Sequence, residues 1–249
     1  MLGAVGLGWG CAAWAAPDAA ALEAVWEAHR ATLDAHAVYP LRFDGAFWAK
    51  VAAGEVGRRR DSLDGTDRIL GLVLVPAARD TTWVAIQDPH AGTIEGFVDE
   101  DLPGSTFARR IVYQRITLPW PLAPRQWVVE VVNNDVLRER TGGAVWERTW
   151  TLSDQRGAAA EVPAGVWLPV NDGGWFVLDA APAGTLVGYH ARTSIGGAVP
   201  DEAAVRWSYG TLSRMLGDIR DRAATWVDGH YVGAHAPVLR PDRTEVPRR

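Results

Sequence analysis

The hydrophobic pattern changes from the period of a strand to the period of a helix between residues 175 and 228. Val187, Tyr189 and Ala191 alternate with Gly188, His190 and Arg192, as in a half-buried strand. From residue 201 onward the apolar residues recur every three or four positions, namely Val205, Tyr209, Leu212, Leu216, Ile219 and Ala223. This stripe predicts an amphipathic helix over 201–228, which Pro200 and two acidic residues begin. A sheet followed by one covering helix can enclose a ligand.

The rest of the chain predicts further strands and two more helices. Asp18 can cap a first helix that reaches about residue 36, and Pro76 opens a short helix that ends before Pro89. The expected strands are 46–58, 66–74, 105–118, 126–137, 144–152, 164–171, 174–180 and 184–193. Turns are expected at 141–143 and 171–174, where glycines cluster. The short gaps favour antiparallel neighbours, so we expect a curved meander.

Alternation within these strands selects a candidate inner face. Trp127, Val129 and Val131 share the side of their strand that carries no charge. In the strand over 144–152, one side carries Trp146, Arg148 and Trp150. In the strand over 174–180, one side carries Trp175, Val177 and Asp179. A buried charge is costly unless it is paired, so Arg148 and Asp179 are expected to meet at the polar end of a cavity. The alternative is that one or both lie on the solvated side of an edge strand.

Composition fits one globular domain with extensions. The chain has 249 residues, of which 48% are hydrophobic, and a net charge of −5 that disfavours nucleic-acid binding. Its single cysteine excludes an internal disulfide, while thirteen tryptophans suit a core and the walls of an apolar site. We expect a leader over 1–16, a domain over 17–228 and an irregular tail over 229–249. The length and the alanine- and arginine-rich composition are typical of bacterial proteins.

The first 16 residues predict a signal peptide. They carry no charge, are too short to span a bilayer and end in Ala13-Trp14-Ala15, a pattern typical of a signal-peptidase site. Export to the periplasm or the medium is therefore expected. The alternative is an apolar N-terminal helix of a cytoplasmic protein, because no basic residue opens the segment.

The linear signatures of enzymes are missing from the sequence. It contains no zinc motif of the His-Glu-x-x-His type, no Gly-x-Ser-x-Gly elbow and no phosphate-binding Gly-x-x-x-x-Gly-Lys loop. The six histidines are scattered, and each is expected to be structural. We therefore expect no metal, no cofactor and no catalytic residue.

Three motifs follow one another along the chain, namely Leu118-Pro119-Trp120-Pro121-Leu122-x-x-Arg125, the segment from Gly174 to Tyr189, and Ile195-Gly196-Gly197-x-x-Pro200. Together they resemble the START domain, the steroidogenic acute regulatory protein-related lipid-transfer module of the Bet v 1-like helix-grip superfamily. The resemblance covers about residues 22–226. Gln126 stands where the family usually has Asp, and Ile195 where it usually has Pro, so the chain resembles a divergent member.

The resemblance implies an α+β helix-grip fold, in which a curved antiparallel sheet wraps around a long C-terminal helix. A tunnel between the sheet and the helix would hold one lipid or sterol. The ligand-binding residues expected are Trp127, Val129, Val131, Trp146, Arg148, Trp150, Trp175, Val177, Asp179, Val187, Tyr189, Tyr209, Leu212 and Leu216. The loop 118–125 and the last helix are expected to form the gate. A monomer is expected, with transient membrane contact and no nucleic-acid partner.

Two alternatives remain open at the level of sequence. Helix-grip proteins include aromatase/cyclases, and such an enzyme could use Arg148, Asp179 and Tyr189 as donors and acceptors. A pure interaction module would fill the cavity with its tryptophans. A lipid carrier needs an apolar pocket of at least several hundred cubic ångströms.

Overall fold

The computed structural model describes residues 18–34, 43–63, 65–87, 96–197, 201–224 and 238–246, and describes the last helix by its backbone alone up to residue 209. The helices are α1 (Ala19–Asp34), α2 (Gly45–Ala52), α3 (Arg79–Gln87), α4 (Asp135–Arg140) and α5 (Asp201–Ala224). The strands are β1 (Gly57–Leu63), β2 (Thr66–Val75), β3 (Phe97–Asp101), β4 (Arg109–Ile116), β5 (Arg125–Asn133), β6 (Val145–Leu152), β7 (Val166–Trp167), β8 (Val170–Asp179) and β9 (Thr185–Ser194).

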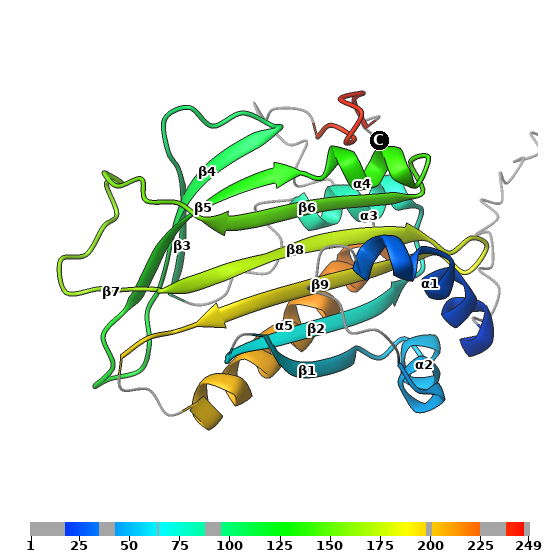
Figure 1. The fold of residues 1–249 in the computed structure, drawn as a ribbon, viewed down its shortest axis with the longest axis horizontal. Helices are drawn as coiled ribbons and strands as arrows, with labels where there is room; N and C mark the ends of the chain where they lie inside the picture. Colours follow the sequence, from blue (N-terminus) through cyan, green and yellow to red (C-terminus); the bar gives the residue numbers. More distant parts are fainter. Residues whose placement is uncertain are drawn as a thin grey trace, which may run out of the picture.

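The strands form one curved sheet in the order β1-β2-β9-β8-β6-β5-β4-β3 (Figure 1). All neighbours along this path are antiparallel, and β7 adds a short parallel pairing to the start of β5. β1 and β3 are therefore the two edges of the described sheet. This α+β architecture, with a long helix at its C-terminal end, is the one predicted from the sequence.

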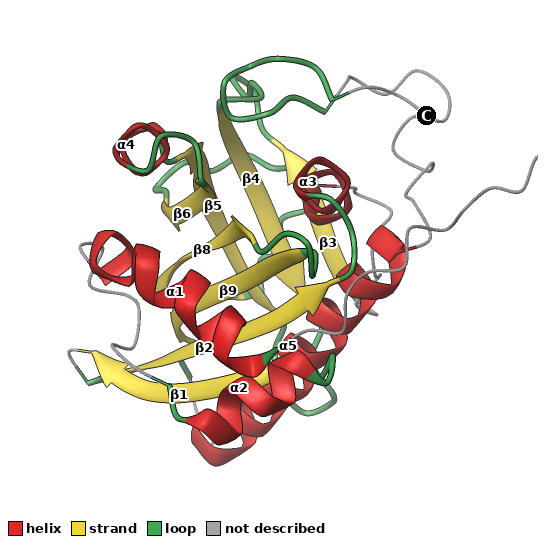
Figure 2. Cartoon of the chain, turned by 90° about the vertical axis from the view of Figure 1, so that its right-hand side faces the viewer, coloured by secondary structure: helices red, strands yellow, loops and turns green. Residues whose placement is uncertain are grey.

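Helices cover both faces of the sheet (Figure 2). On the face that we call the inner face, Val73, Val177 and Val187 pack with Leu212 and Leu216 of α5, and α3 joins the same apolar cluster. On the outer face the core is made by α1, α2 and α4 with the opposite sides of the strands, including Leu22, Trp26, Leu72, Leu137, Phe176 and Leu186. Strand alternation thus sends each apolar row to its own layer of helices.

Two glycines let bulky neighbours approach the sheet closely. A Cβ atom on Gly71 of β2 would lie 2.6 Å from a methyl carbon of Leu216, so α5 crosses β2 at this position. On the outer face, a Cβ atom on Gly188 would lie 1.8 Å from the ring of Phe176. Neither position has room for a side chain, so both contacts depend on glycine.

The structure corrects the prediction of a strand over 46–58. Residues 45–52 form α2, because the Asp44 side chain accepts a hydrogen bond from the Phe47 amide at 2.8 Å and caps the helix. Trp48 and Val51 lie three positions apart and both are buried. The strand that follows, β1, begins only at Gly57.

The turn predicted at 171–174 is also wrong, because β8 runs without interruption from Val170 to Asp179. The two glycines serve close packing: a Cβ atom on Gly173 would lie 2.2 Å from the carbonyl oxygen of His190 and 2.5 Å from the Trp150 ring. Two further elements, β3 and α4, were not predicted, and α4 takes up the end of the strand expected over 126–137.

Part of the C-terminal segment packs on α3. The indole nitrogen of Trp83 donates to the carbonyl oxygen of Leu239 at 2.9 Å, and Val238 and Val246 are buried. Arg240 forms an ion pair with Asp80. Residues 238–246 thus complete the apolar cluster around α3, whereas the predicted leader lies outside the described residues.

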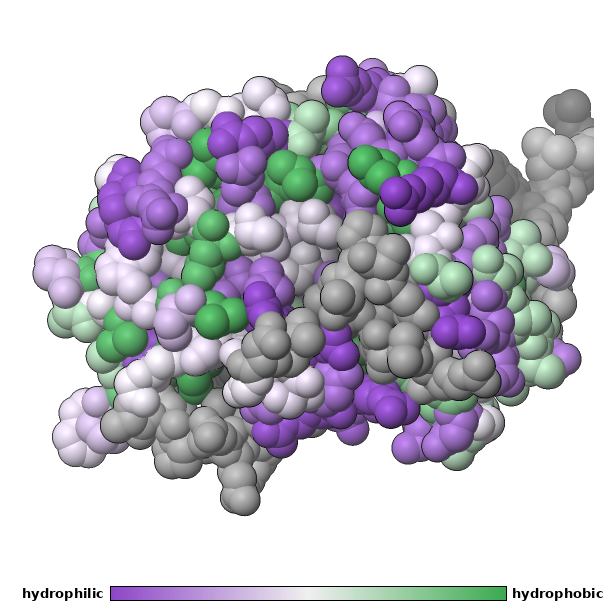
Figure 3. Space-filling view, viewed as in Figure 1, coloured by the Kyte–Doolittle hydropathy of each residue, from purple (hydrophilic) through white to green (hydrophobic). Residues whose placement is uncertain are grey.

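Among the described residues, no helix is both long enough and apolar enough to cross a membrane. Figure 3 shows the side seen in Figure 1, where hydrophobic residues appear in small separate groups among polar ones.

Candidate ligand-binding site

An aromatic cluster lies in the middle of the inner face. Trp175 is opposite Tyr189 in the pairing of β8 with β9, and their ring centroids are 4.7 Å apart. Trp150 of β6 adds a third ring, 5.4 Å from that of Tyr189. These three side chains come from adjacent strands and form one continuous apolar surface.

The cluster is only half-buried, although the next residues along the same strands, Phe176 and His190, are fully buried on the outer face. At the same time, burial among protein atoms raises the pKa of the Tyr189 phenol above its usual value. The three rings are therefore partly accessible, although the Tyr189 phenol lies among many protein atoms.

The other expected wall residues divide into packed and half-buried groups. Val177, Val187, Leu212 and Leu216 are buried in the contact between sheet and α5. Trp146 is buried against Trp83, with ring centroids 5.6 Å apart. Val129 is buried, whereas Trp127 and Val131 of the same strand are half-buried. The side chain of Tyr209 lies outside the described residues.

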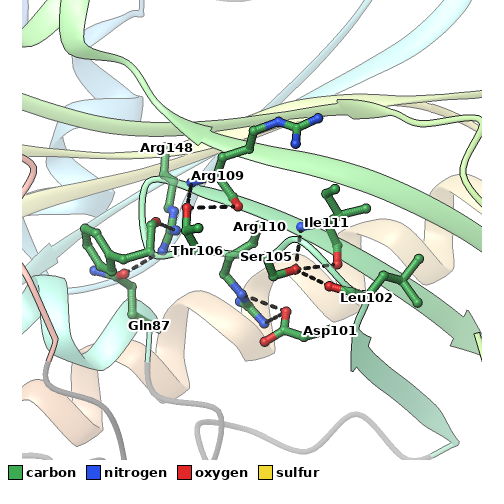
Figure 4. Close-up of polar contacts among 10 residues, drawn as sticks. Gln87, Asp101, Leu102, Ser105, Thr106, Arg109, Arg110, Ile111 and Arg148 are labelled. Carbon is green, nitrogen blue, oxygen red and sulfur yellow. Dashed lines mark hydrogen bonds and ion pairs between the residues drawn. The ribbon is translucent and has the colours of Figure 1, made fainter.

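Arg148 is the buried cation of the inner face, with only 7% of its surface exposed. Its Nη1 donates to the Gln87 side-chain oxygen at 2.6 Å, and its Nη2 donates to the carbonyl oxygen of Phe107 (Figure 4). The guanidinium also lies over the Phe107 ring, 5.0 Å from its centroid. Desolvation, followed by the charge of nearby Arg110, lowers the pKa of Arg148 to about 10.

The predicted pair of Arg148 with Asp179 does not form. Arg148 is opposite Trp175 in the sheet, so Asp179 lies four residues further along β8, roughly 13 Å away along the strand. Asp179 is exposed, and its carboxylate accepts a hydrogen bond from the backbone of Ala181 at 3.1 Å. The two residues share a face but lie at different ends of it.

The partners that Arg148 does have could not be predicted from the sequence. Gln87 is the last residue of α3, and Phe107 lies in the loop before β4. Neither is marked by a motif, and only the folding of α3 and this loop over the end of β6 brings them together. Asn133, which is opposite Arg148 on β5, was missed for the same reason.

Arg125 connects the loop before β5 with the segment that follows β9. This buried side chain donates to three backbone carbonyl oxygens, those of Ala123, Ile195 and Gly196. Next to it, Gln126 accepts from the Tyr113 hydroxyl at 3.0 Å and the Val162 amide at 3.1 Å. The Gln126 side-chain nitrogen donates to the carbonyl oxygens of Val162 and Gly165. The residues of two sequence motifs are thus tied together through Arg125.

A buried polar pair occupies the outer face rather than the candidate site. His190 lies 3.4 Å from Glu147, and both side chains are almost completely buried. This agrees with the expectation that His190 points away from Tyr189. Within the described ranges, no three His, Cys, Asp or Glu residues are grouped so as to hold a metal ion.

Comparison with solved structures identifies the architecture. A STAR-related lipid transfer protein from Xanthomonas axonopodis superposes with a TM-score of 0.55 at 19% identity, covering 68% of this chain and 93% of that one. The human StAR-related lipid transfer protein 5 gives 0.57 at 15% identity, with 83% and 96% covered. This chain has the START fold. Human STARD10, at a TM-score of 0.54 and 13% identity, covers 93% of the chain and 95% of its own length.

The similarity of this chain to known proteins is weaker in sequence than in structure. No model of a known protein family matches it, and no curated protein matches it either. The identities of 13–19% with the three superposed proteins fit a divergent sequence on this fold.

Proposed function

We propose that this protein binds a lipid, sterol or similar apolar molecule between the inner face of the sheet and α5, without catalysing a reaction on it. The observation that carries the proposal is the half-buried aromatic cluster of Trp150, Trp175 and Tyr189 in the middle of this face. Large apolar rings left partly uncovered inside a fold are suited to an apolar ligand. The START fold of the chain supports the same conclusion.

Burial of apolar surface would supply most of the affinity. A ligand that buries roughly 400 Å² against the cluster gains on the order of 10 kcal/mol before the cost of ordering it. Half-buried Val131 and Trp127 extend the apolar surface along β5. The expected selectivity is therefore for the size and shape of the apolar part.

Entry of the ligand is proposed to occur at the loop 118–125 and the start of α5. Trp120 in this loop is 93% exposed, which suits an indole that enters a membrane interface. Arg125 ties the loop to residues 195 and 196, which come shortly before α5. A movement of this loop would therefore be transmitted to the start of α5.

A filling variant tests the binding site. Val131→Trp places a large ring on the inner face of β5, whereas Val132→Trp places the same ring on the outer face of the same strand. We expect native mass spectrometry and organic extraction to find a co-purified apolar molecule in the natural protein and in the Val132→Trp protein, but much less in the Val131→Trp protein. A natural protein that carries no small molecule and binds no added lipid would instead support an interaction module.

A further inference from the structure

The inner face holds a buried positive charge that the described part of the chain does not neutralise. Arg148 has no carboxylate partner there, and its Nε atom is buried without any hydrogen-bond acceptor. Its two bonded nitrogens reach neutral oxygens only, on Gln87 and Phe107. A buried guanidinium in this state has lost water on one side without gaining an anion in its place.

The charged residues nearest to Arg148 pair with each other and not with Arg148. Arg110 of β4 donates to Asp101 of β3 through Nε at 3.0 Å and Nη2 at 2.7 Å, as Figure 4 shows. The Asp101 carboxylate is thereby engaged by a closer arginine. Asp99 of β3 also lies near Arg110, and burial raises the pKa of its carboxyl group above the usual value. Neither carboxyl group is a hydrogen-bond partner of Arg148.

A second polar atom without a partner lies next to Arg148. Asn133 is opposite Arg148 in the pairing of β5 with β6, and its side-chain oxygen is buried without a hydrogen bond. The oxygen and nitrogen of an amide can exchange places by a flip, so Asn133 can present either a donor or an acceptor. Arg148 and Asn133 thus offer at least one charged and one neutral group to the same small region.

This polar region continues directly into the aromatic cluster. Trp175 is opposite Arg148 on β8, and Trp150 follows Arg148 by two residues on the same face of β6. A molecule with its polar end at Arg148 would therefore place its apolar part against Trp175 and Trp150. The arrangement is that of a site for an amphiphile.

We propose that the ligand carries a single carboxylate, as a fatty acid does, and that Arg148 binds this carboxylate while the aromatic cluster binds the hydrocarbon. The inference rests on the proposed function, because it names the class of ligand for the same site. A single carboxylate supplies the anionic partner that Arg148 lacks, and its two oxygens can accept from the free Nε and from Asn133.

The test compares the fluorescent fatty acid cis-parinaric acid with its methyl ester, which has the same chain and no charge. We expect the natural protein to bind the acid about 10- to 100-fold more tightly than the ester, the range expected for a hydrogen bond to a charged group. Arg148→Met should lower the affinity for the acid by about 10- to 100-fold, and should lower it much more than the affinity for the ester. Arg109→Met is the matched control, because Arg109 is an exposed arginine of the same sheet that pairs with Glu130.

The outcomes separate this inference from the proposed function. Equal binding of acid and ester by the natural protein would overturn the carboxylate site and leave apolar binding intact. Failure of both probes, and of a neutral sterol probe, would overturn the proposed function itself. The comparison on the natural protein decides the matter even if Arg148→Met does not fold.

Discussion

The Nε atom of Arg125 donates a 2.7 Å hydrogen bond to the carbonyl oxygen of Ile195, seventy residues away along the chain. A second nitrogen of the same guanidinium donates to Gly196, and a third donates to Ala123 in the loop before β5. One buried cation therefore satisfies three carbonyl groups from two loops. Gly197 lies against it with a φ of +70°, where a Cβ atom would be 3.1 Å from the guanidinium.

Arg125→Met should destabilise the fold by about 2–4 kcal/mol, because three buried carbonyl groups lose a charged donor. Arg125→Lys should recover only part of this, since an ammonium group cannot reach the three acceptors in the plane of a guanidinium. Urea unfolding followed by tryptophan fluorescence measures both. An unchanged midpoint for Arg125→Met would mean that water replaces the guanidinium at no cost.

Gln126→Glu should be more damaging than its size suggests. The Gln126 amide donates to the carbonyl oxygens of Val162 and Gly165, and a carboxylate would face those oxygens with no proton to donate. We expect a loss of about 2–4 kcal/mol at neutral pH, with partial recovery in acid as the new carboxyl group becomes protonated. Thermal unfolding at two pH values tests this, and a pH-independent loss would contradict the proposed cause.

Gly188→Ala should destabilise the protein by about 2–4 kcal/mol, because the added methyl group would overlap the buried ring of Phe176. Gly210→Ala in α5 is the matched control, since nothing lies within 4 Å of its Cβ position. That substitution should stabilise the helix by about 0.5–1 kcal/mol. Denaturant unfolding of the two variants should therefore give effects of opposite sign.

The Tyr189 phenol should make the fold weaker in alkali. Burial raises its pKa, so the unfolded chain loses this proton first, near its ordinary pKa of about 10. The free energy of unfolding that Tyr189 contributes through this proton is fully present below that pH and is lost as the pH rises above it. Between about pH 9 and pH 11, Tyr189→Phe should lose about 1 kcal/mol less free energy of unfolding than the natural protein. Parallel curves for the two proteins would show that the phenol ionises as freely in the folded state.

The architecture could be predicted because long periodic segments dominate it. The stripe of Leu212, Leu216 and Ile219 fixed the face of α5, and the alternation through Trp175 and Tyr189 matches the face that β8 and β9 turn toward it. The predictions were wrong where the local composition is typical of a different structure from the one that forms. The glycines at 173 and 174 are typical of turns, but here they allow His190 and Trp150 to approach a continuous strand.

The polar part of the site could not be predicted in the same way. Alternation placed Arg148 on the inner face, but it gave no information about position along the strand, and so it suggested a partner, Asp179, at the wrong end. Choosing between Asp179 and Gln87 requires the register of β6 with β8 and the position of α3. Both are set by tertiary packing.

The open sheet ends in two edge strands of opposite charge, with Arg58, Arg59 and Arg60 in β1 and Asp99, Glu100 and Asp101 in β3. An uncovered edge invites a strand from another molecule to extend the sheet, which is a common start of aggregation. Here two β1 edges would bring arginines together, and two β3 edges would bring carboxylates together. Like charges therefore oppose both symmetric pairings, so two copies of the protein are disfavoured from extending one sheet by joining the same edge strand.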